Sequence, residues 1–332
     1  MGDSRSILIL SDIHYAAAAE KERGWRESDC IPNPALRLAV RAYRHFIWRR
    51  DPFAHNYLLD RVVEESQPAD YVLANGDYSC DSAFIGLSDD ASYQSAEECL
   101  RKLRQKFGDT LLLTIGDHEL GKLSLFGGQG GMRLASWHRV IDELKVGAFW
   151  KIELGNYLLL GVTSSLLAFP VYEPEALPEE RAVWEELRAG HVALISEAFA
   201  CLKPDQRVIL FCHDPTALPF LLRTPCVQSR IHQIHATVIG HLHSEFYMLN
   251  SRFLSGMPTL HPFGNSIRRM SAALNEARHW KPFKVHLCPA LAGIQLLKDG
   301  GYLRLELDLD AGKLPRFQFH RLHWSEGKPA LR

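Results

Sequence analysis

The sequence has no excess of charge of either sign and no long apolar run. Its 332 residues carry 38 Lys and Arg against 39 Asp and Glu, for a formal net charge of -1. Proteins that bind nucleic acid as a polyelectrolyte have strongly basic surfaces, so nucleic acid is not the expected partner. The apolar runs, such as residues 7–10, are far shorter than the ~20 residues that span a bilayer, so we expect no transmembrane segment.

The chain also lacks C-x-x-C pairs and low-complexity linkers, and we expect no secretory leader. Its seven cysteines are scattered, with no C-x-x-C pair for zinc or redox chemistry, and we interpret them as reduced thiols. An apolar run begins at Ile7, too early for a secretory signal to precede it. These features predict a cytoplasmic protein. No stretch rich in Pro, Gly or Ser divides residues 1–332, which favours a single domain.

Short apolar strands, each followed within three residues by Asp or His, are the main feature that is present. Five such strands are expected at residues 7–10, 71–74, 110–115, 208–212 and 236–239. Helical patterns at 56–66, 94–107 and 191–202 lie between them, and this alternation predicts an α/β fold. Further strands are expected at 149–154, 157–162, 284–287, 302–309 and 317–324.

The polar residues at the strand ends form a set of carboxylates and imidazoles. The set comprises Asp12, His14, Asp77, Asp117, His213, His241 and His243. Open α/β sheets bind ligands at the carboxyl ends of their strands, so we expect these side chains to converge. Such donors suit Zn, Mn or Fe, and seven exceed the needs of one tetrahedral ion. A pair of ions bridged by a carboxylate is the economical arrangement, and two-metal sites serve phosphoryl displacement.

Five blocks of this set, in order along the chain, resemble the calcineurin-like metallophosphoesterase superfamily. The blocks are Asp12-Ile13-His14, Gly76-Asp77, Gly116-Asp117-His118-Glu119, His213 and Gly240-His241-Leu242-His243. The resemblance implies a four-layer αββα sandwich with two mixed sheets. It also implies a metal-dependent hydrolase that cleaves a small phosphorylated substrate, a phosphomonoester or phosphodiester, with a hydroxide activated by two metal ions.

The resemblance implies a role for each block. One ion would be bound by Asp12, His14, Asp77 and His243, and the other by Asp77, Asp117, His213 and His241, with Asp77 as the bridge. His118 would contact the substrate phosphate or protonate the leaving oxygen. We expect Glu119 to support the site structurally rather than to take part in catalysis.

Two residues depart from the superfamily pattern. Most relatives have Asn where this chain has Asp117, and many have a second Asp where this chain has Cys80. With three ionised aspartates, two divalent ions would leave a site charge of +1 (4 minus 3) rather than +2. A trivalent ion, Fe(III), paired with divalent Mn, Fe or Zn would restore +2.

Two segments are expected to be helical insertions, at residues 15–53 and 258–282. In the first, Asn33 is the expected N-cap of a helix that begins with Pro34. Its apolar residues share one face, and Arg37, Arg41 and Arg44 occupy another. Three interpretations remain open for this helix. It could pack by its apolar face, close over the site as a cap whose arginines bind the substrate, or contact a membrane surface.

The motifs predict the reaction class and not the substrate. A nucleotide-sugar or lipid-linked pyrophosphate hydrolase of the same fold is therefore an alternative, with peripheral membrane contact. A non-catalytic metal-binding module is an alternative of a different class. The complete set of ligand-type residues, together with His118, argues against a module that has lost its chemistry.

Overall fold

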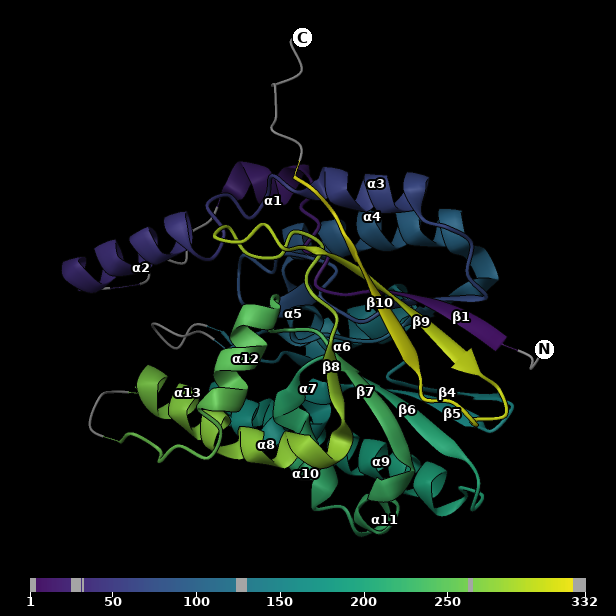
Figure 1. Cartoon of the computed structure of the whole chain (residues 1–332). Coiled ribbons are helices and arrows are strands. Elements are labelled where there is room, and N and C mark those ends of the chain that lie inside the picture. Colours follow the sequence, from purple (N-terminus) through teal and green to yellow (C-terminus); the bar gives the residue numbers. More distant parts are fainter. Residues whose placement is uncertain (1–3, 25–30, 32, 124–129, 262–264, 325–332) are drawn as a thin grey trace.

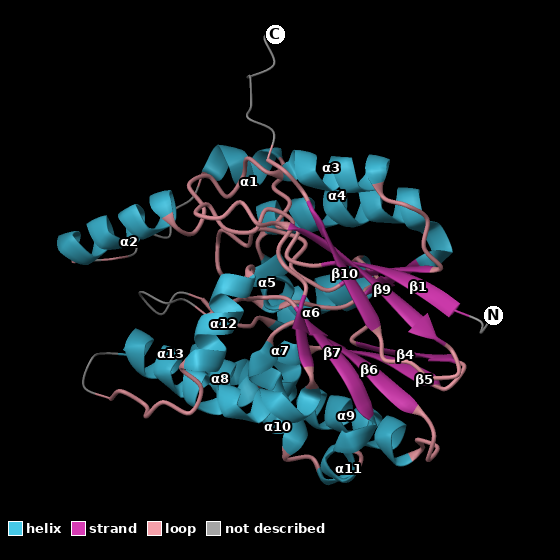
Figure 2. Cartoon of the chain, viewed as in Figure 1, coloured by secondary structure: helices cyan, strands magenta, loops and turns pink. Residues whose placement is uncertain are grey.

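The computed structural model describes residues 4–24, 31, 33–123, 130–261 and 265–324 and has four layers (Figure 1). Two five-stranded sheets pack against each other, and helices cover their outer faces (Figure 2). The strand orders are β10-β9-β1-β2-β3 and β4-β5-β6-β7-β8. Each sheet contains parallel and antiparallel pairs, so the αββα sandwich with two mixed sheets is confirmed.

The first sheet has a parallel centre and an antiparallel edge. Strands β1 (Ser4–Leu10), β2 (Tyr71–Ala74) and β3 (Leu111–Leu113) run parallel. Strands β9 (Gly301–Asp308) and β10 (Arg316–Arg321) form a hairpin that adds to β1. The loops after β1, β2 and β3 therefore leave the same edge of this sheet.

The second sheet is parallel apart from its first strand. Strand β4 (Phe149–Leu154) pairs antiparallel with β5 (Tyr157–Val162). Strands β6 (Arg207–Cys212), β7 (Ile234–Ile239) and β8 (Val285–Leu287) then follow in parallel. This arrangement places the ends of β6 and β7 side by side, as in the first sheet.

Strand β1 shows why the strands are apolar throughout. Ile7 and Ile9 lie in the core between the two sheets, with Leu159 and Phe211 of the second sheet. Leu8 and Leu10, which lie on the opposite face of the strand, are in the core under the helices. Because both faces of the strand are covered, it reads as a continuous apolar run.

The helices fall into an outer layer on each sheet and a set of short elements near the strand ends. The longer ones are α3 (Asn56–Glu65), α4 (Asp90–Phe107) and α9 (Arg181–Ala200). The short ones are α1 (Ala18–Arg23), α5 (Asp117–Leu120), α6 (Leu134–His138), α7 (Ser164–Leu167), α8 (Phe169–Tyr172), α10 (Leu218–Leu222) and α11 (Pro225–Ser229).

Several predicted boundaries were wrong, among them the start of α4, which lies at Asp90 rather than 94. Helix α9 begins at Arg181, ten residues before the predicted 191. The exposed Gly190 lies inside this helix and does not end it. Strand β3 covers only three of the six residues expected at 110–115. Strand β10 ends at Arg321 rather than 324, where its pairing with β9 reaches Gly301 and stops.

Both predicted insertions contain helices. Helix α2 (Pro34–Phe46) begins as expected, because the Asn33 side chain accepts hydrogen bonds from the backbone N–H groups of Ala35 and Leu36. Helix α12 (Glu245–Phe253) precedes the second insertion, which contains α13 (Asn265–Glu276). Residues 25–30, 32 and 262–264 of the insertions lie outside the described residues. Figure 1 shows α2, α12 and α13 at the same end of the molecule.

The described residues can be compared with two expectations from the sequence, namely that no segment spans a membrane and that the cysteines are reduced. Among these residues, no helix combines the length and the apolar character that crossing a membrane requires. Six cysteines lie in this part of the chain and all six are free thiols, whereas Cys30 lies outside it.

Candidate metal centre

The seven predicted ligands converge at the seam between the two sheets. Their potential ligand atoms form two groups in which all atoms lie within 4.8 Å of one another. One group is Asp77, Asp117, His213 and His241, and the other is Asp12, His14 and His243. Each group matches one of the two metal sets implied by the resemblance. The one difference is that Asp77, which the resemblance places in both sets, is absent from the group of Asp12, His14 and His243.

Asp77 lies between the two groups. Its Oδ2 atom is 3.2 Å from His213 Nε2 and 3.9 Å from His14 Nε2. The same oxygen lies 3.7 Å from Nε2 of His118. It is buried and has no hydrogen-bond partner among the described residues. An ionised oxygen in that position is suited to bridge two cations.

Backbone carbonyls orient three of the imidazoles. His213 donates a hydrogen bond from Nδ1 to the carbonyl oxygen of Asn75 at 2.5 Å. The carbonyl of Ser79 accepts from Nδ1 of both His14 and His118, at 3.3 and 3.1 Å. With each Nδ1 carrying the proton, each Nε2 presents its lone pair to the site.

These residues fit a pair of transition-metal ions. Nε2 of His14 lies 3.1 Å from Nε2 of His243, and Nε2 of His213 has no hydrogen-bond partner among the described residues. Buried polar atoms are rarely left in this state unless another group satisfies them. A mixture of imidazole and carboxylate donors favours Zn, Mn or Fe over Mg.

The buried carboxylates of the cluster also favour the binding of cations. Burial and the neighbouring Asp117 carboxylate raise the pKa of Asp77 to about 6. Burial alone would raise the pKa of Asp12 as well, but the imidazoles of His243 and His213 hold it well below its usual value. Burial opposes protonation of His213, yet Asp77 and Asp12 keep its pKa well above the usual value. The carboxylates thus favour protonation within the site. Bound cations would neutralise the negative charge of the carboxylates instead.

Five of the seven residues have the left-handed backbone conformation. The φ angles are 49° at Asp12 and His14, 60° at Asp77, 62° at His241 and 61° at His243. This region is unfavourable for residues with a Cβ atom, by about 1 kcal/mol or more for each. Such strain is typical of functional sites, where the surrounding structure enforces it.

The backbone around His241 and His243 turns sharply rather than continuing extended from β7. The N–H of Leu242 bonds to the carbonyl of Gly240 at 2.6 Å, and that of Ser244 bonds to Leu242 at 2.7 Å. These are consecutive tight turns, which place the two imidazoles in different groups rather than in one.

Glycine is required where the blocks approach one another. A Cβ atom on Gly240 would collide with Ser11 Oγ and Asp12 Oδ2. One on Gly116 would collide with Asp77 Oδ1. The glycines of the motifs therefore allow loops from both sheets to close on one centre.

Glu119 connects two of the blocks, in agreement with its expected structural role. Its carboxylate accepts hydrogen bonds from the backbone N–H groups of Gly116, Asp77 and Tyr78, at 2.8, 2.9 and 2.8 Å. Burial and the nearby charge of Asp77 raise the pKa of Glu119 to about 8. The carboxyl group thus holds the β2 and β3 loops together beneath the site.

Cys80, the second departure from the pattern, is part of the local structure. Its thiol donates to the carbonyl of His14 at 3.1 Å, and burial raises its pKa, so the group stays neutral. The next residue, Asp81, is buried and accepts a hydrogen bond from the N–H of Gly86 at 2.9 Å. Neither residue belongs to the two groups that the seven candidate ligands form.

The segment that follows α2 supplies two residues that the sequence interpretation missed. The indole of Trp48 stacks on the imidazole of His243, with ring centroids 4.5 Å apart. Arg49 is 4% exposed, and its Nη2 has no hydrogen-bond partner among the described residues. After burial, the charge of Arg49 is the main factor that lowers the pKa of His14 and of His243, so the guanidinium lies near the site. The run Trp48-Arg49-Arg50 at the helix end was the available signal.

The three arginines predicted to bind the substrate lie on α2, and none of them is buried. Arg37 donates from Nε and Nη2 to the carbonyl of Ile31, at 3.0 and 2.8 Å, which holds it at the base of the helix. For Arg41 and Arg44 a role in substrate binding stays a prediction. The alternative that α2 packs by its apolar face is wrong, since none of its residues is buried.

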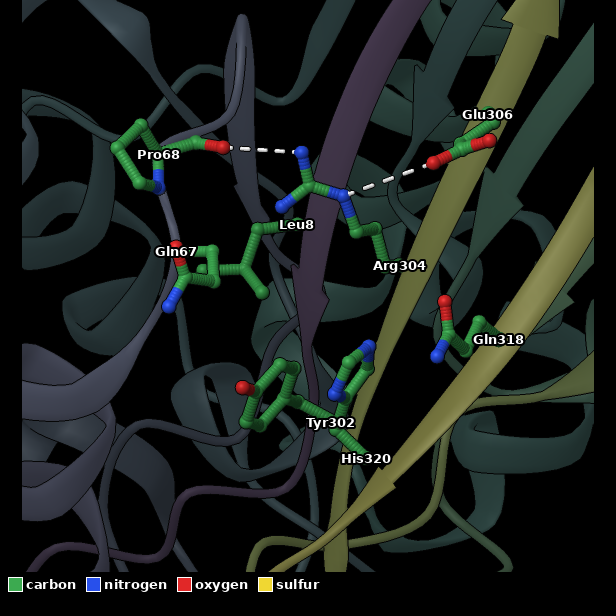
Figure 3. Close-up of a pocket in the computed structure, with 8 residues that line it drawn as sticks. All are labelled: Leu8, Gln67, Pro68, Tyr302, Arg304, Glu306, Gln318 and His320. Carbon is green, nitrogen blue, oxygen red and sulfur yellow. Dashed lines mark hydrogen bonds and ion pairs between the residues drawn. The ribbon is translucent and has the colours of Figure 1, made fainter.

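A cavity of about 370 Å³ elsewhere in the molecule contains none of the seven residues (Figure 3). It lies beside β9 and β10 and is lined by Leu8, Gln67, Pro68, Tyr302, Arg304, Glu306, Gln318 and His320. Arg304 is occupied there, donating to the carbonyl of Pro68 at 2.9 Å and lying 4.0 Å from a carboxylate oxygen of Glu306. The cavity is therefore separate from the candidate metal centre.

The chain matches one sequence family. The profile of the calcineurin-like phosphoesterases matches residues 5–245, which include all seven predicted ligands. No curated protein matches the chain in sequence.

Solved structures similar to the chain include three proteins. A conserved protein of Streptococcus pneumoniae TIGR4, described as a predicted phosphoesterase, is 11% identical over 96% of this chain and 100% of its own, with a TM-score of 0.28. Phosphopantetheinyl hydrolase of Mycobacterium tuberculosis is 17% identical over 73% and 84%, with a TM-score of 0.35. A purple acid phosphatase from yellow lupin seeds is 10% identical over 93% and 50%, with a TM-score of 0.38.

Proposed function

The chain belongs to the calcineurin-like phosphoesterase family and is thus a metal-dependent phosphoester hydrolase; we propose that it works with two metal ions on a small phosphorylated substrate. The observation that carries this proposal is the position of Asp77 between two groups of metal-binding side chains. Asp12, His14, Asp77 and His243 would hold one ion, and Asp77, Asp117, His213 and His241 the other. When bound, the ions would activate water and neutralise charge on the phosphoryl oxygens.

His118 is the proposed proton-transfer group. Its Nδ1 proton is held by the carbonyl of Ser79, so Nε2 is the atom that can exchange a proton with the substrate. Burial and the nearby Lys122 hold the pKa of His118 well below its usual value. The negative charge of a bound phosphate would raise that pKa, so that Nε2 carries a proton when the leaving oxygen needs one.

Arg49 is the proposed phosphate-binding arginine. It is buried, its Nη2 has no partner among the described residues, and its charge acts on His14 and His243. A buried guanidinium with free donors gains most from an anion that it can bind through two hydrogen bonds. Because Arg49 follows α2, this proposal assigns substrate binding to the end of the first insertion.

Turnover of two aryl phosphates tests the proposal. The full chain, loaded with Mn, should hydrolyse p-nitrophenyl phosphate or bis(p-nitrophenyl) phosphate, and the preferred compound distinguishes a monoesterase from a diesterase. Replacing Arg49→Ala should lower kcat/KM about 30-fold, or about 2 kcal/mol, while Arg49→Lys restores part of it. If the metal-loaded protein turned over neither compound, the non-catalytic module would be the better interpretation.

A further inference from the structure

Helix α2 is amphipathic, yet it buries neither of its faces. None of its residues is buried, and its large apolar side chains are exposed: Leu38 to 70%, Phe46 to 67% and Leu36 to 42%. Figure 1 shows the helix projecting from the body of the molecule. A helix that keeps this much apolar surface in water indicates a partner that covers it.

Helix α12 adds to this apolar surface. Phe246, Leu249 and Phe253 are 43%, 60% and 87% exposed, and their spacing places them on one face of the helix. The opposite face carries Met248, which is buried in the core. The exposed face of α12 is therefore not needed to hold the helix on the protein.

Helices α2, α12 and α13 lie on the same side of the molecule (Figure 1). The hydroxyl groups of Tyr43 and Tyr247 are 2.6 Å apart and connect α2 with α12. Helix α13 lies at the same end of the molecule and exposes Met270 to 59% (Figure 1). We call the exposed side chains of these three helices the end surface: Leu36, Leu38, Phe46, Phe246, Leu249, Phe253 and Met270.

The charge next to the end surface is mostly positive. Residues 31–50 contain five arginines and no Asp or Glu, although the chain as a whole has a net charge of -1. On the other two helices the exposed Arg252 and Arg268 add to this charge, and only Glu245 of α12 and Glu276 of α13 oppose it. A second copy of the chain would bring the same basic segment against the first, and the two would repel each other. An apolar surface bordered by arginines is instead complementary to anionic lipid headgroups and the acyl chains beneath them.

We propose that the end surface docks the protein on an anionic phospholipid bilayer. The apolar side chains of α2 and α12 enter the interface between headgroups and acyl chains, and the arginines of α2 together with Arg50 bind the phosphates. The same segment ends in Trp48 and Arg49, so the docked face lies next to the candidate metal centre. This inference goes beyond the proposed function and does not depend on it, because membrane binding is measured without turnover.

Vesicle flotation with the full chain tests the inference. At about 0.1 M salt the protein should bind vesicles of phosphatidylcholine and phosphatidylglycerol at least about tenfold more tightly than vesicles of phosphatidylcholine alone. At about 0.5 M salt this preference should fall, because the Debye length shortens. The double variant Leu38→Asp/Phe46→Asp should lose at least about tenfold in affinity for the mixed vesicles.

Leu314→Asp is the matched control, since Leu314 is 77% exposed in the turn between β9 and β10, away from the end surface. It should leave vesicle binding unchanged. Far-ultraviolet circular dichroism of both variants checks that they fold.

Three results would overturn the inference. One is failure of the wild-type protein to bind anionic vesicles. Another is an equal loss of binding in the Leu314→Asp control. The third is a dimer in gel filtration that Leu38→Asp/Phe46→Asp dissociates, because a second copy would then be the occupant of the surface.

Discussion

The indole ring of Trp48 lies on the imidazole of His243, with centroids 4.5 Å and planes 30° apart. The first residue comes from the predicted insertion and the second from the loop after β7, so the contact connects the insertion with the candidate metal centre. The backbone carbonyls of Ile47 and Trp48 also accept hydrogen bonds from Leu296 and Gln295, at 3.2 and 2.7 Å. The end of the insertion is thus anchored over one of the two groups of candidate ligands, although helix α2 itself is exposed.

The stacking of Trp48 should slow the release of metal. In Trp48→Ala, the imidazole of His243 loses the ring that holds it in place and shields it from water, so a chelator should remove one ion about tenfold faster. Trp48→Phe keeps a stacked ring and should behave like the wild type. Stopped-flow measurement with a coloured chelator gives the rates, and equal rates in all three proteins would exclude this role.

Asp77 should be needed for both metal ions. The wild-type protein, expressed with ample metal, should contain close to two transition-metal ions, whereas Asp77→Asn should retain fewer than one, since the bridge loses its charge. Asp81→Asn is the control, because Asp81 is also buried but belongs to neither group. Elemental analysis measures the content, and a wild-type value below one ion would contradict the dinuclear proposal.

His118 should contribute to turnover and not to metal binding. Replacing His118→Ala removes the imidazole that faces Asp77 at 3.7 Å and should lower kcat about 100-fold while metal content is unchanged. His138→Ala is a suitable control, because that histidine is largely exposed on α6. Steady-state kinetics with an aryl phosphate measures the effect. An unaltered kcat would show that His118 takes no part in the reaction.

Asp117 should set the charge of the site. Asp117→Asn raises the charge with two divalent ions from +1 to +2, so the ions polarise water more strongly and the acid limb of the rate profile should move to lower pH. The variant should also retain less trivalent iron, because it offers one anionic ligand fewer. The pH profile of kcat and the iron content are the measurements, and no change in either would refute the charge argument.

His191 should make folding stability depend on pH. Burial lowers its pKa from 6.5 to about 4, and its Nε2 accepts a hydrogen bond from the N–H of Thr163 at 3.1 Å. The unfolded chain therefore binds the proton more readily, so this contribution is present above pH 6.5 and is lost as pH falls toward 4. The loss is about 3 kcal/mol at most.

The variant His191→Gln keeps an acceptor for Thr163 and cannot titrate, so it should lack this part of the pH dependence. Urea unfolding of wild type and variant at pH 7 and at about pH 4 gives the difference. Parallel stability curves for the two proteins would mean that His191 is not a buried neutral base.

The sequence by itself determined the strands and the set of ligand-type residues. Ile7 to Leu10 and Tyr71 to Ala74 were recognisable because buried parallel strands are apolar on both faces. The residues Asp12, Asp77 and His213 were recognisable because each lies within three residues of the end of such a strand, and carboxyl ends of parallel strands meet at one edge. Local pattern carries this information, since burial of a strand and the position of its last residue are both properties of a short segment.

Only the tertiary structure decided how the insertion relates to the site. Arg37, Arg41 and Arg44 looked like candidates for substrate binding from helix periodicity, but the fold buries Arg49 beside the metal centre and leaves α2 in solvent. Periodicity defines the faces of a helix and not the direction in which either face points. That direction depends on where the chain is anchored, here by the pairing of Trp48 with Gln295, and contacts between residues so distant in sequence form only when the whole chain has folded.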